Sequence, residues 1–238
     1  MAATTSSLHR ETIRYKAGTT DLEGMLVYDG STKGRRPGVL LAHSRMGLDA
    51  FTRRRAVQLA RRGGAVFALD LYGEGRGAQN AAEADELARA LFDDRALLRA
   101  RAQAALKILR EQRFVESRNL AAVGFGLGGC AALELARGGA DLRGAVSFHG
   151  TLKTGGAGTE PGFHGRLLVL HGAEDALVPP PEVAAFQQEM KEAKADWRLI
   201  TYGGCAHAFT DPDAGTYNGA ADTRSWAAAC AFLDEIFD

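Results

Sequence analysis

The sequence has no long apolar run, few cysteines and no excess of charge of either sign. A helix that crosses a bilayer needs about 20 consecutive apolar residues, and no run here approaches that length. The 29 basic and 29 acidic residues balance, which argues against a nucleic-acid partner or an anionic membrane surface. Cys130, Cys205 and Cys230 are scattered without metal-ligand spacing. We therefore expect free thiols in a reducing compartment, and a cytoplasmic protein.

Internal repeats, composition breaks and linker-like segments are also missing from the sequence. The first residues carry no apolar signal core, so we expect residues 1–10 to form a short disordered lead-in and residues 11–238 to form a single domain. The histidines lack the spacing of metal ligands, and we expect neither a metal nor another cofactor. A small-molecule substrate is the expected partner, and the protein is expected to be a monomer or a homodimer.

What the sequence does contain is an alternation of short apolar runs with amphipathic segments. Residues 11–16 and 24–29 predict a hairpin, with its turn at residues 21–24. The apolar runs at residues 37–43 and 65–70 predict buried strands, and further strands are expected at residues 120–123, 144–149, 166–171 and 197–202. Helices are expected at residues 50–62, 81–92, 94–112, 127–137, 179–194 and 220–237. This alternation predicts an α/β fold, with a mostly parallel sheet and helices on both faces.

The most informative segment is Ala121–Cys130, where an apolar strand enters a glycine-rich turn and then a helix. A strand, a sharp turn and a helix in this order form the nucleophile elbow of α/β-hydrolases, usually written G-x-S-x-G. In that register Gly124, Gly126 and Gly128 take the three key positions. The central position should carry the nucleophilic oxygen or sulfur, and Gly126 has no side chain. The missing nucleophile is the main functional question that the sequence raises.

Two later residues match the remaining positions of a hydrolase triad. In such folds ligands bind at the carboxyl ends of the strands. Asp175 lies in a tight turn after a buried strand, and His207 lies in a loop of small residues after the last strand. Asp175 alone is explained as a turn residue and His207 alone as a loop histidine, but their order after the elbow favours a catalytic pair. Glu174 is the alternative acid, and His149 and His171 are expected to be structural.

Backbone donors complete the expected site. The turn after the first parallel strand supplies one N–H of the oxyanion hole in this fold, and the residue after the nucleophile supplies the other. These positions are Arg45 and Leu127. Backbone donors survive any side-chain change, so the hole persists without a nucleophile. Arg45, Arg76 and Tyr72 lie near the expected pocket mouth and are candidate substrate-binding residues, the two arginines for an anionic group.

With these residues in view, the sequence resembles the dienelactone hydrolase family, the carboxymethylenebutenolidase-like α/β-hydrolases. The resemblance extends from about residue 11 to residue 237 and rests on several separate motifs in the same order. These motifs are Asp70–Gly75, Asp94–Ala96, Ala121–Gly129, Ser147–Gly150, Leu170–Asp175, Val178–Pro180 and His207–Pro212.

The resemblance implies hydrolysis of enol-lactones and related esters by a cysteine in a Gly-x-Cys-x-Gly-Gly elbow, completed by a histidine and an aspartate. It also implies a glutamate after the first parallel strand, which interacts with the thiol. Matched position by position, Asp175 and His207 are present, the cysteine position is Gly126 and the glutamate position is Ser44. Two of the four functional side chains are therefore absent.

Four explanations of Gly126 remain open. The chain is a non-hydrolytic relative, in which glycine relieves the strain of a positive φ. Alternatively, His207 acts as a general base on water or on a substrate carbon acid. A third explanation is that another residue is the nucleophile. Ser44 is the leading candidate, and Cys205 and Cys130 are the other two. The fourth is an engineered inactivation of an ordinary family enzyme.

The retained His207 and Asp175 favour an enzyme, because a pure binding relative has no need of this pair. We therefore expect a dienelactone-hydrolase-like protein that acts on a small ester, lactone or related carbonyl compound. In this interpretation Asp175 orients His207, the acid/base, and Gly126 marks the empty nucleophile position. The alternative is a non-hydrolytic relative, either an acid/base isomerase or cyclase or a ligand-binding pseudoenzyme.

Overall fold

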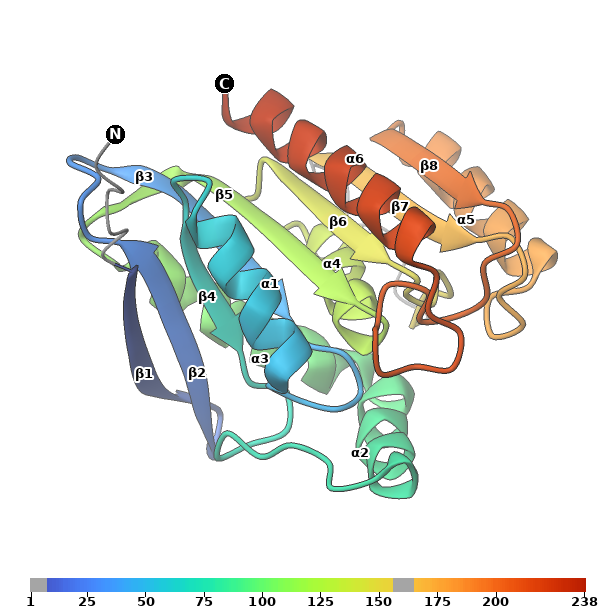
Figure 1. Cartoon of the computed structure of the whole chain (residues 1–238), viewed down its shortest axis with the longest axis horizontal. Helices are drawn as coiled ribbons and strands as arrows, with labels where there is room; N and C mark the ends of the chain where they lie inside the picture. The colour runs from blue at the N-terminus through green and yellow to red at the C-terminus, as the bar shows by residue number, and fades with distance from the viewer. Residues whose placement is uncertain (1–7, 156–164) are drawn as a thin grey trace.

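The computed structural model describes residues 8–155 and 165–238. Within these residues eight strands form one sheet, in the order β1-β2-β4-β3-β5-β6-β7-β8 (Figure 1). The strands are β1 (Leu8–Ala17), β2 (Thr20–Asp29), β3 (Arg36–Ala42), β4 (Ala65–Leu69), β5 (Val115–Phe125), β6 (Gly144–Phe148), β7 (Arg166–Gly172) and β8 (Asp196–Tyr202). β1 and β2 form an antiparallel hairpin, β2 runs antiparallel to β4, and the pairs from β4 to β8 are parallel. The mostly parallel sheet predicted from the sequence is therefore confirmed.

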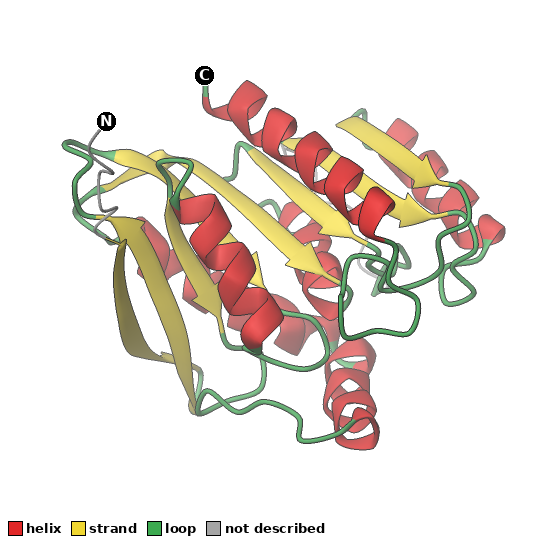
Figure 2. Ribbon diagram, viewed as in Figure 1, coloured by secondary structure: helices red, strands yellow, loops and turns green. Residues whose placement is uncertain are grey.

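Helices cover both faces of this sheet (Figure 2). They are α1 (Ala50–Ala60), α2 (Ala81–Asp93), α3 (Arg95–Arg110), α4 (Leu127–Arg137), α5 (Pro180–Glu192) and α6 (Gly219–Phe237). α1 and α6 lie on the face toward the viewer in Figure 1, and α3, α4 and α5 lie on the opposite face. Among the described residues, no helix has the length and apolar character needed to cross a bilayer.

Successive residues of the central strands serve two separate apolar layers. On β3, Leu40 packs in the layer that contains α3 and α4, and Leu41 packs in the layer that contains α1 and α6. Side chains alternate between the two faces of a strand, so a strand covered on both faces must be apolar at every position. This explains the continuous apolar runs in the sequence.

The order of the strands creates one point where the chain changes direction across the sheet. β3 lies between β4 and β5. The connection from β3 to β4 runs through α1 on one face, and the connection from β4 to β5 runs through α2 and α3, with α3 on the other face. Such a switch leaves a crevice at the carboxyl ends of the two strands that diverge. The loop after β3 and the turn after β5 therefore meet where a ligand is expected.

Two expectations at the N-terminus are wrong. The hairpin turns at Gly18 and Thr19, since Ala17 pairs with Thr20, and Gly18 has φ +58°, as tight two-residue turns require. Residues 21–24 lie inside β2, where Gly24 is needed because a Cβ there would lie 2.4 Å from the ring of Phe67. β1 begins at Leu8, so residues 8–10 belong to the sheet; residues 1–7 of the expected lead-in lie outside the described part.

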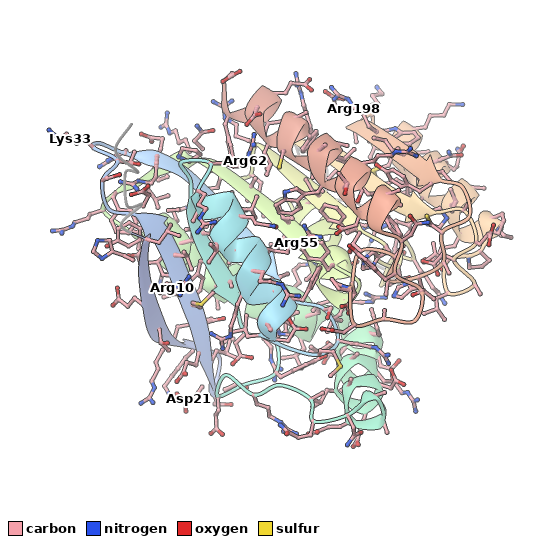
Figure 3. All side chains as sticks on the ribbon, in the orientation of Figure 1. Arg10, Asp21, Lys33, Arg55, Arg62 and Arg198 are labelled. Carbon is pink, nitrogen blue, oxygen red and sulfur yellow. The ribbon has the colours of Figure 1, made fainter. Side chains whose placement is uncertain are left out.

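Three arginines tie α6 to its neighbours, and Figure 3 labels all three. The Arg62 guanidinium lies 2.6 Å from Asp234, and that of Arg198 lies 2.6 Å from Glu235. Both pairs are exposed, and such pairs contribute only about 0–1 kcal/mol each. Arg55 of α1 is buried, forms an ion pair with Asp222 and stacks 4.5 Å from the ring centre of Trp226. This contact fixes the start of α6, directly after the loop that carries His207.

Candidate active site

The elbow joins β5 to α4 at a crossing too close for side chains. A Cβ on Gly124 would lie 1.9 Å from the carbonyl oxygen of Gly128. One on Gly128 would lie 2.2 Å from the carbonyl oxygen of Ala42, at the end of β3. Real Cβ atoms do not approach backbone this closely, so both positions must be glycine. The strand, turn and helix predicted for this segment are present, with α4 beginning at Leu127.

Gly126, at the tip of the elbow, is different. Its backbone has φ +54° and ψ −111°, a conformation that costs about 1–3 kcal/mol for a residue with a Cβ. A Cβ here would meet no atom closer than His207 Nε2 at 3.8 Å and His149 Nδ1 at 3.9 Å, apart from its own chain neighbours. Both are ordinary van der Waals distances. A side chain at this position would fit, and it would point at the histidine.

Asp175 and His207 form the expected pair. The Nδ1–H of His207 donates to Asp175 Oδ2 at 2.9 Å, which leaves Nε2 as an acceptor on the side of Gly126. The carboxylate is buried, whereas the imidazole side chain is 31% exposed, so solvent reaches it. The Leu177 N–H also donates to Asp175, at 2.9 Å. Glu174, the alternative acid, is exposed.

The charge of the pair follows from these contacts. Burial raises the pKa of Asp175, but the hydrogen bond and charge of His207, with the Leu177 N–H, lower it by more. The net pKa lies below the ordinary value, so Asp175 is ionised at neutral pH. An ionised carboxylate holds the imidazole in the tautomer whose Nε2 accepts a proton and stabilises the imidazolium that forms.

His149 was expected to be structural, and the structure places it against the elbow. It follows β6, its Nε2 lies 2.8 Å from Thr210 Oγ1, and its ring centre lies 5.4 Å from that of His207. Phe125 pairs with Phe148 on the neighbouring strand, so the residues that follow them, Gly126 and His149, meet at the same edge. The sequence alone does not give this register.

The loop after β3 lies against the start of α4, as the close approach of Ala42 to Gly128 shows. His43 is buried beneath this loop: its Nε2 accepts from the Leu71 N–H at 3.0 Å, so its Nδ1–H donates to Ser44 O at 2.6 Å. Ser44 Oγ accepts a long bond from the Met46 N–H at 3.4 Å. Within the described residues, no hydrogen bond joins Ser44 to His207.

Both expected oxyanion donors are available in this arrangement. Leu127 is the first residue of α4, and the first N–H groups of a helix have no partner within it. Arg45 lies in the loop after β3, where the Tyr72 hydroxyl donates to its carbonyl oxygen at 2.8 Å. Among the described residues, no acceptor takes the N–H of Arg45 or Leu127.

The three candidate substrate-binding side chains already have partners. The Arg45 guanidinium forms an ion pair with Asp85, and that of Arg76 lies 3.2 Å from Glu83. Both acids lie on α2, and both pairs are exposed, so they are weak and open to exchange. Tyr72 is buried, and burial raises the pKa of its hydroxyl above the ordinary value. Its hydroxyl holds the Arg45 loop in place.

Neither cysteine near the site is an activated nucleophile. Cys130 lies one turn into α4, fully buried beside the Arg95 guanidinium, and burial raises its thiol pKa to about 12. Cys205 is buried, donates to Gly203 O at 3.6 Å, and burial raises its pKa as well. The thiolate is the nucleophilic form, and neither thiol forms it at neutral pH. Among the described residues, no group of three or more potential ligands could hold a metal ion.

Comparison with known proteins decides the family. The model of the dienelactone hydrolase family matches residues 22–237. The chain belongs to this family. The resemblance seen in the sequence motifs is thereby confirmed, and the fold agrees with it.

Individual relatives agree with this assignment. The crystal structure of the dienelactone hydrolase-like promiscuous phosphotriesterase P91 from metagenomic libraries shares 36% identity, with a TM-score of 0.91 over 98% of this chain and 100% of that chain. A structure named m3DLH shares 39% identity, with a TM-score of 0.89 over the same shares of the two chains. A Bradyrhizobium sp protein named "Probable 2-oxo-3-(5-oxofuran-2-ylidene)propanoate lactonase" is 27% identical over 210 residues, 84% of each chain. The family and these relatives support a hydrolase-like function.

Proposed function

We propose that this protein hydrolyses small activated esters, lactones or related carbonyl compounds, with water as the nucleophile and His207 as the general base. The observation that carries the proposal is the position of His207 Nε2, 3.8 Å from the point where a side chain of Gly126 would begin. Nδ1 of the same ring is held by the buried Asp175. A water molecule beside Gly126 is therefore within reach of an oriented base.

The reaction requires no covalent intermediate on the protein. His207 Nε2 takes a proton from the water as its oxygen bonds to the carbonyl carbon. The π electron pair of the carbonyl moves to its oxygen, which the N–H groups of Arg45 and Leu127 stabilise. The intermediate then collapses, the bond to the leaving oxygen breaks, and His207 returns its proton to that oxygen.

This mechanism limits the substrates. General acid–base catalysis contributes about 10²–10⁴-fold, without the further gain of a covalent nucleophile. The substrate must therefore carry a good leaving group, such as the enolate of an enol-lactone or a phenolate. The name of the Bradyrhizobium relative supports a lactone as substrate. Because one similar solved structure is named a phosphotriesterase, an aryl phosphate triester is also worth testing as a substrate.

Hydrolysis of para-nitrophenyl acetate, dihydrocoumarin and a diethyl aryl phosphate tests the proposal. The unsubstituted chain should hydrolyse at least one ester or lactone, and His207→Ala should lower kcat about 10²–10⁴-fold. Intact-mass spectrometry during turnover should show no acyl group on the unsubstituted chain. The matched control is Gly126→Cys, which should carry an acyl group on its new thiol.

Two outcomes would contradict the proposal. An acyl adduct on the unsubstituted chain, lost together with activity in Ser44→Ala, would show a relocated nucleophile. If the unsubstituted chain is inert while Gly126→Cys hydrolyses the same probes, the scaffold is intact but water is not its nucleophile. The non-hydrolytic alternatives, an isomerase, a cyclase or a binding protein, would then take precedence.

A further inference from the structure

His149 lies beside the elbow because of how β5 and β6 pair. Phe125 is in register with Phe148, and the Gly126 N–H extends the ladder by donating to Phe148 O at 2.9 Å. The residues that end the two strands, Gly126 and His149, therefore lie side by side. His149 has φ +39°, a region that residues with side chains rarely adopt and that recurs at functional sites.

The His149 ring is fixed in one orientation. It is 3% exposed, and Nε2 lies 2.8 Å from the hydroxyl of Thr210, which is itself fully buried. The ring also packs edge-on against Phe209, with 5.4 Å between ring centres, and lies 6.2 Å from Phe125. These contacts determine where the other nitrogen, Nδ1, points.

Nδ1 of His149 has no hydrogen-bond partner among the described residues. A buried polar atom without a partner costs about 1–3 kcal/mol, so the arrangement is unfavourable unless something outside the protein fills the role. A Cβ on Gly126 would lie 3.9 Å from this atom and 3.8 Å from His207 Nε2. Two imidazole nitrogens therefore face the same small space.

We propose that His149 Nδ1 and His207 Nε2 together bind the attacking water beside Gly126, which makes His149 a second catalytic residue. This role rests on the proposed function, because it names the group that holds the water on which His207 acts. A cysteine or serine nucleophile is held in place by its own covalent bond. A water has no such restraint, and a second hydrogen bond supplies the orientation that the side chain would have given.

This role requires one tautomer of His149. When the ring proton of His149 is on Nε2, the Nε2–H donates a hydrogen bond to Thr210 Oγ1. Nδ1 then carries no proton and can accept a hydrogen bond. The water then donates one O–H to His207 and the other to His149, and its lone pair is left for the carbonyl carbon. On attack His207 takes the first proton. The second stays on the oxygen, as the hydroxyl of the tetrahedral intermediate.

His149 orients the water without becoming a base. Burial lowers the pKa of His149 well below its ordinary value, and the neighbouring His207 lowers it further, against the opposing effect of Asp175. His149 therefore stays neutral, and the Nδ1–H of His207 faces the carboxylate of Asp175.

Two amide substitutions separate the two ring nitrogens of His149. In His149→Gln the amide reaches the Nε2 position and keeps a partner for Thr210, but nothing remains at Nδ1. In His149→Asn the shorter amide lies at the Nδ1 position and the contact with Thr210 is lost. We expect His149→Gln to lower kcat about 100-fold with little change in KM, and His149→Asn to retain most of the activity. Equal losses in two variants with the same melting temperature would overturn the proposal.

The Gly126→Cys background is the control for a purely structural role. There the thiol makes the first attack, so His149→Gln should leave the rate of acyl-enzyme formation nearly unchanged. Water is still needed for the second step, so the same substitution should slow deacylation and make the acyl-enzyme accumulate. Slowing of both steps to the same extent would show that His149 only supports the fold, and would contradict the proposal.

A measurement without turnover separates this role from the proposed function. If the unsubstituted chain hydrolyses none of the probes, the proposed function fails, and a high-resolution crystal structure still tests the water site. A water within about 3.2 Å of both His149 Nδ1 and His207 Nε2, absent in His149→Gln, supports the site. Absence of that water from the unsubstituted chain, or a His149 ring turned away from Gly126, overturns it.

Discussion

The glycines of the elbow are of two kinds. At Gly124 and Gly128 a Cβ would lie 1.9 Å and 2.2 Å from a backbone oxygen, so packing alone excludes any side chain. At Gly126 the nearest atoms outside its immediate neighbours are 3.8 Å and 3.9 Å away, so packing would accept one. The fold therefore requires the flanking glycines. It does not require the central glycine, whose effect is to remove the side chain that would act as the nucleophile.

The rest of the site follows the same division. The Asp175–His207 hydrogen bond is present, and the N–H groups of Arg45 and Leu127 have no acceptor among the described residues. Gly126 and Ser44 stand at the two positions whose functional side chains are absent. The chain therefore holds an imidazole oriented by a carboxylate beside a space that no side chain of residue 126 fills.

Alanine substitutions test the comparison directly and carry the largest expected effect. Gly124→Ala places a methyl group into backbone, beyond the usual overpacking cost of about 1–3 kcal/mol, so we expect little folded protein. Gly126→Ala meets no clash and should cost about 1–3 kcal/mol, from the positive φ alone. Chemical denaturation of both variants measures the difference. Equal stabilities would mean that the elbow relaxes freely and that its flanking glycines are not required.

The sequence predicted most of the fold because the relevant signals are local. The apolar runs of the parallel strands and the glycines of the elbow are fixed by burial on both faces and by a close crossing. The hairpin turn was placed wrongly because Asp21 and Gly24 resemble turn residues. Gly24 is glycine for a distant reason, the ring of Phe67 on a neighbouring strand, which no local pattern reports.

The site was predictable where it depends on chain order. Asp175 and His207 follow strands in the order of the fold, and they meet in the structure. The position of His149 depends on the register of β5 against β6, and the partners of Arg45 and Arg76 depend on where α2 lies. Neither the register nor the helix position is determined by the residues near them in sequence.

Asp175→Asn tests whether the carboxylate charge is needed by His207. The amide would hold the imidazole without the charge that stabilises its protonated form, so kcat should fall about 100-fold or more. Because the folded pKa of Asp175 is lowered, its ionisation stabilises the fold above the unfolded pKa of about 3.9. That stability is lost as the pH falls through the folded value. The free energies of unfolding of the two proteins should therefore become more similar as the pH falls from about 6 to about 3. Urea unfolding at several pH values measures this.

The pH dependence of stability expected from His149 is smaller. It arises because the fold favours the neutral form of this side chain, whereas at Asp175 it favours the charged form. Its folded pKa lies well below 6.5, so below that pH the unfolded chain binds a proton that the folded chain does not. Stability should therefore fall with decreasing pH, by up to about 1.4 kcal/mol per pH unit from this group. His149→Asn removes the titration, so its unfolding free energy should depend less on pH between about 6.5 and 5. Parallel pH profiles for the two proteins would show that His149 is not held neutral in the fold.

The smallest expected effect is at Arg76, a candidate substrate-binding residue. Arg76 is exposed and paired with Glu83, and an exposed ion pair contributes about 0–1 kcal/mol. Arg76→Ala should therefore leave kcat/KM for a neutral ester nearly unchanged, and lower it by at most about fivefold for an ester that carries a carboxylate. Glu83→Gln is the matched control, since it frees the guanidinium and should raise kcat/KM for the anionic ester alone. Equal changes for neutral and anionic esters would mean that Arg76 acts on the shape of the loop. Its role would then be structural, like that of Gly124 and Gly128, and Arg76 would not bind the charge of the substrate.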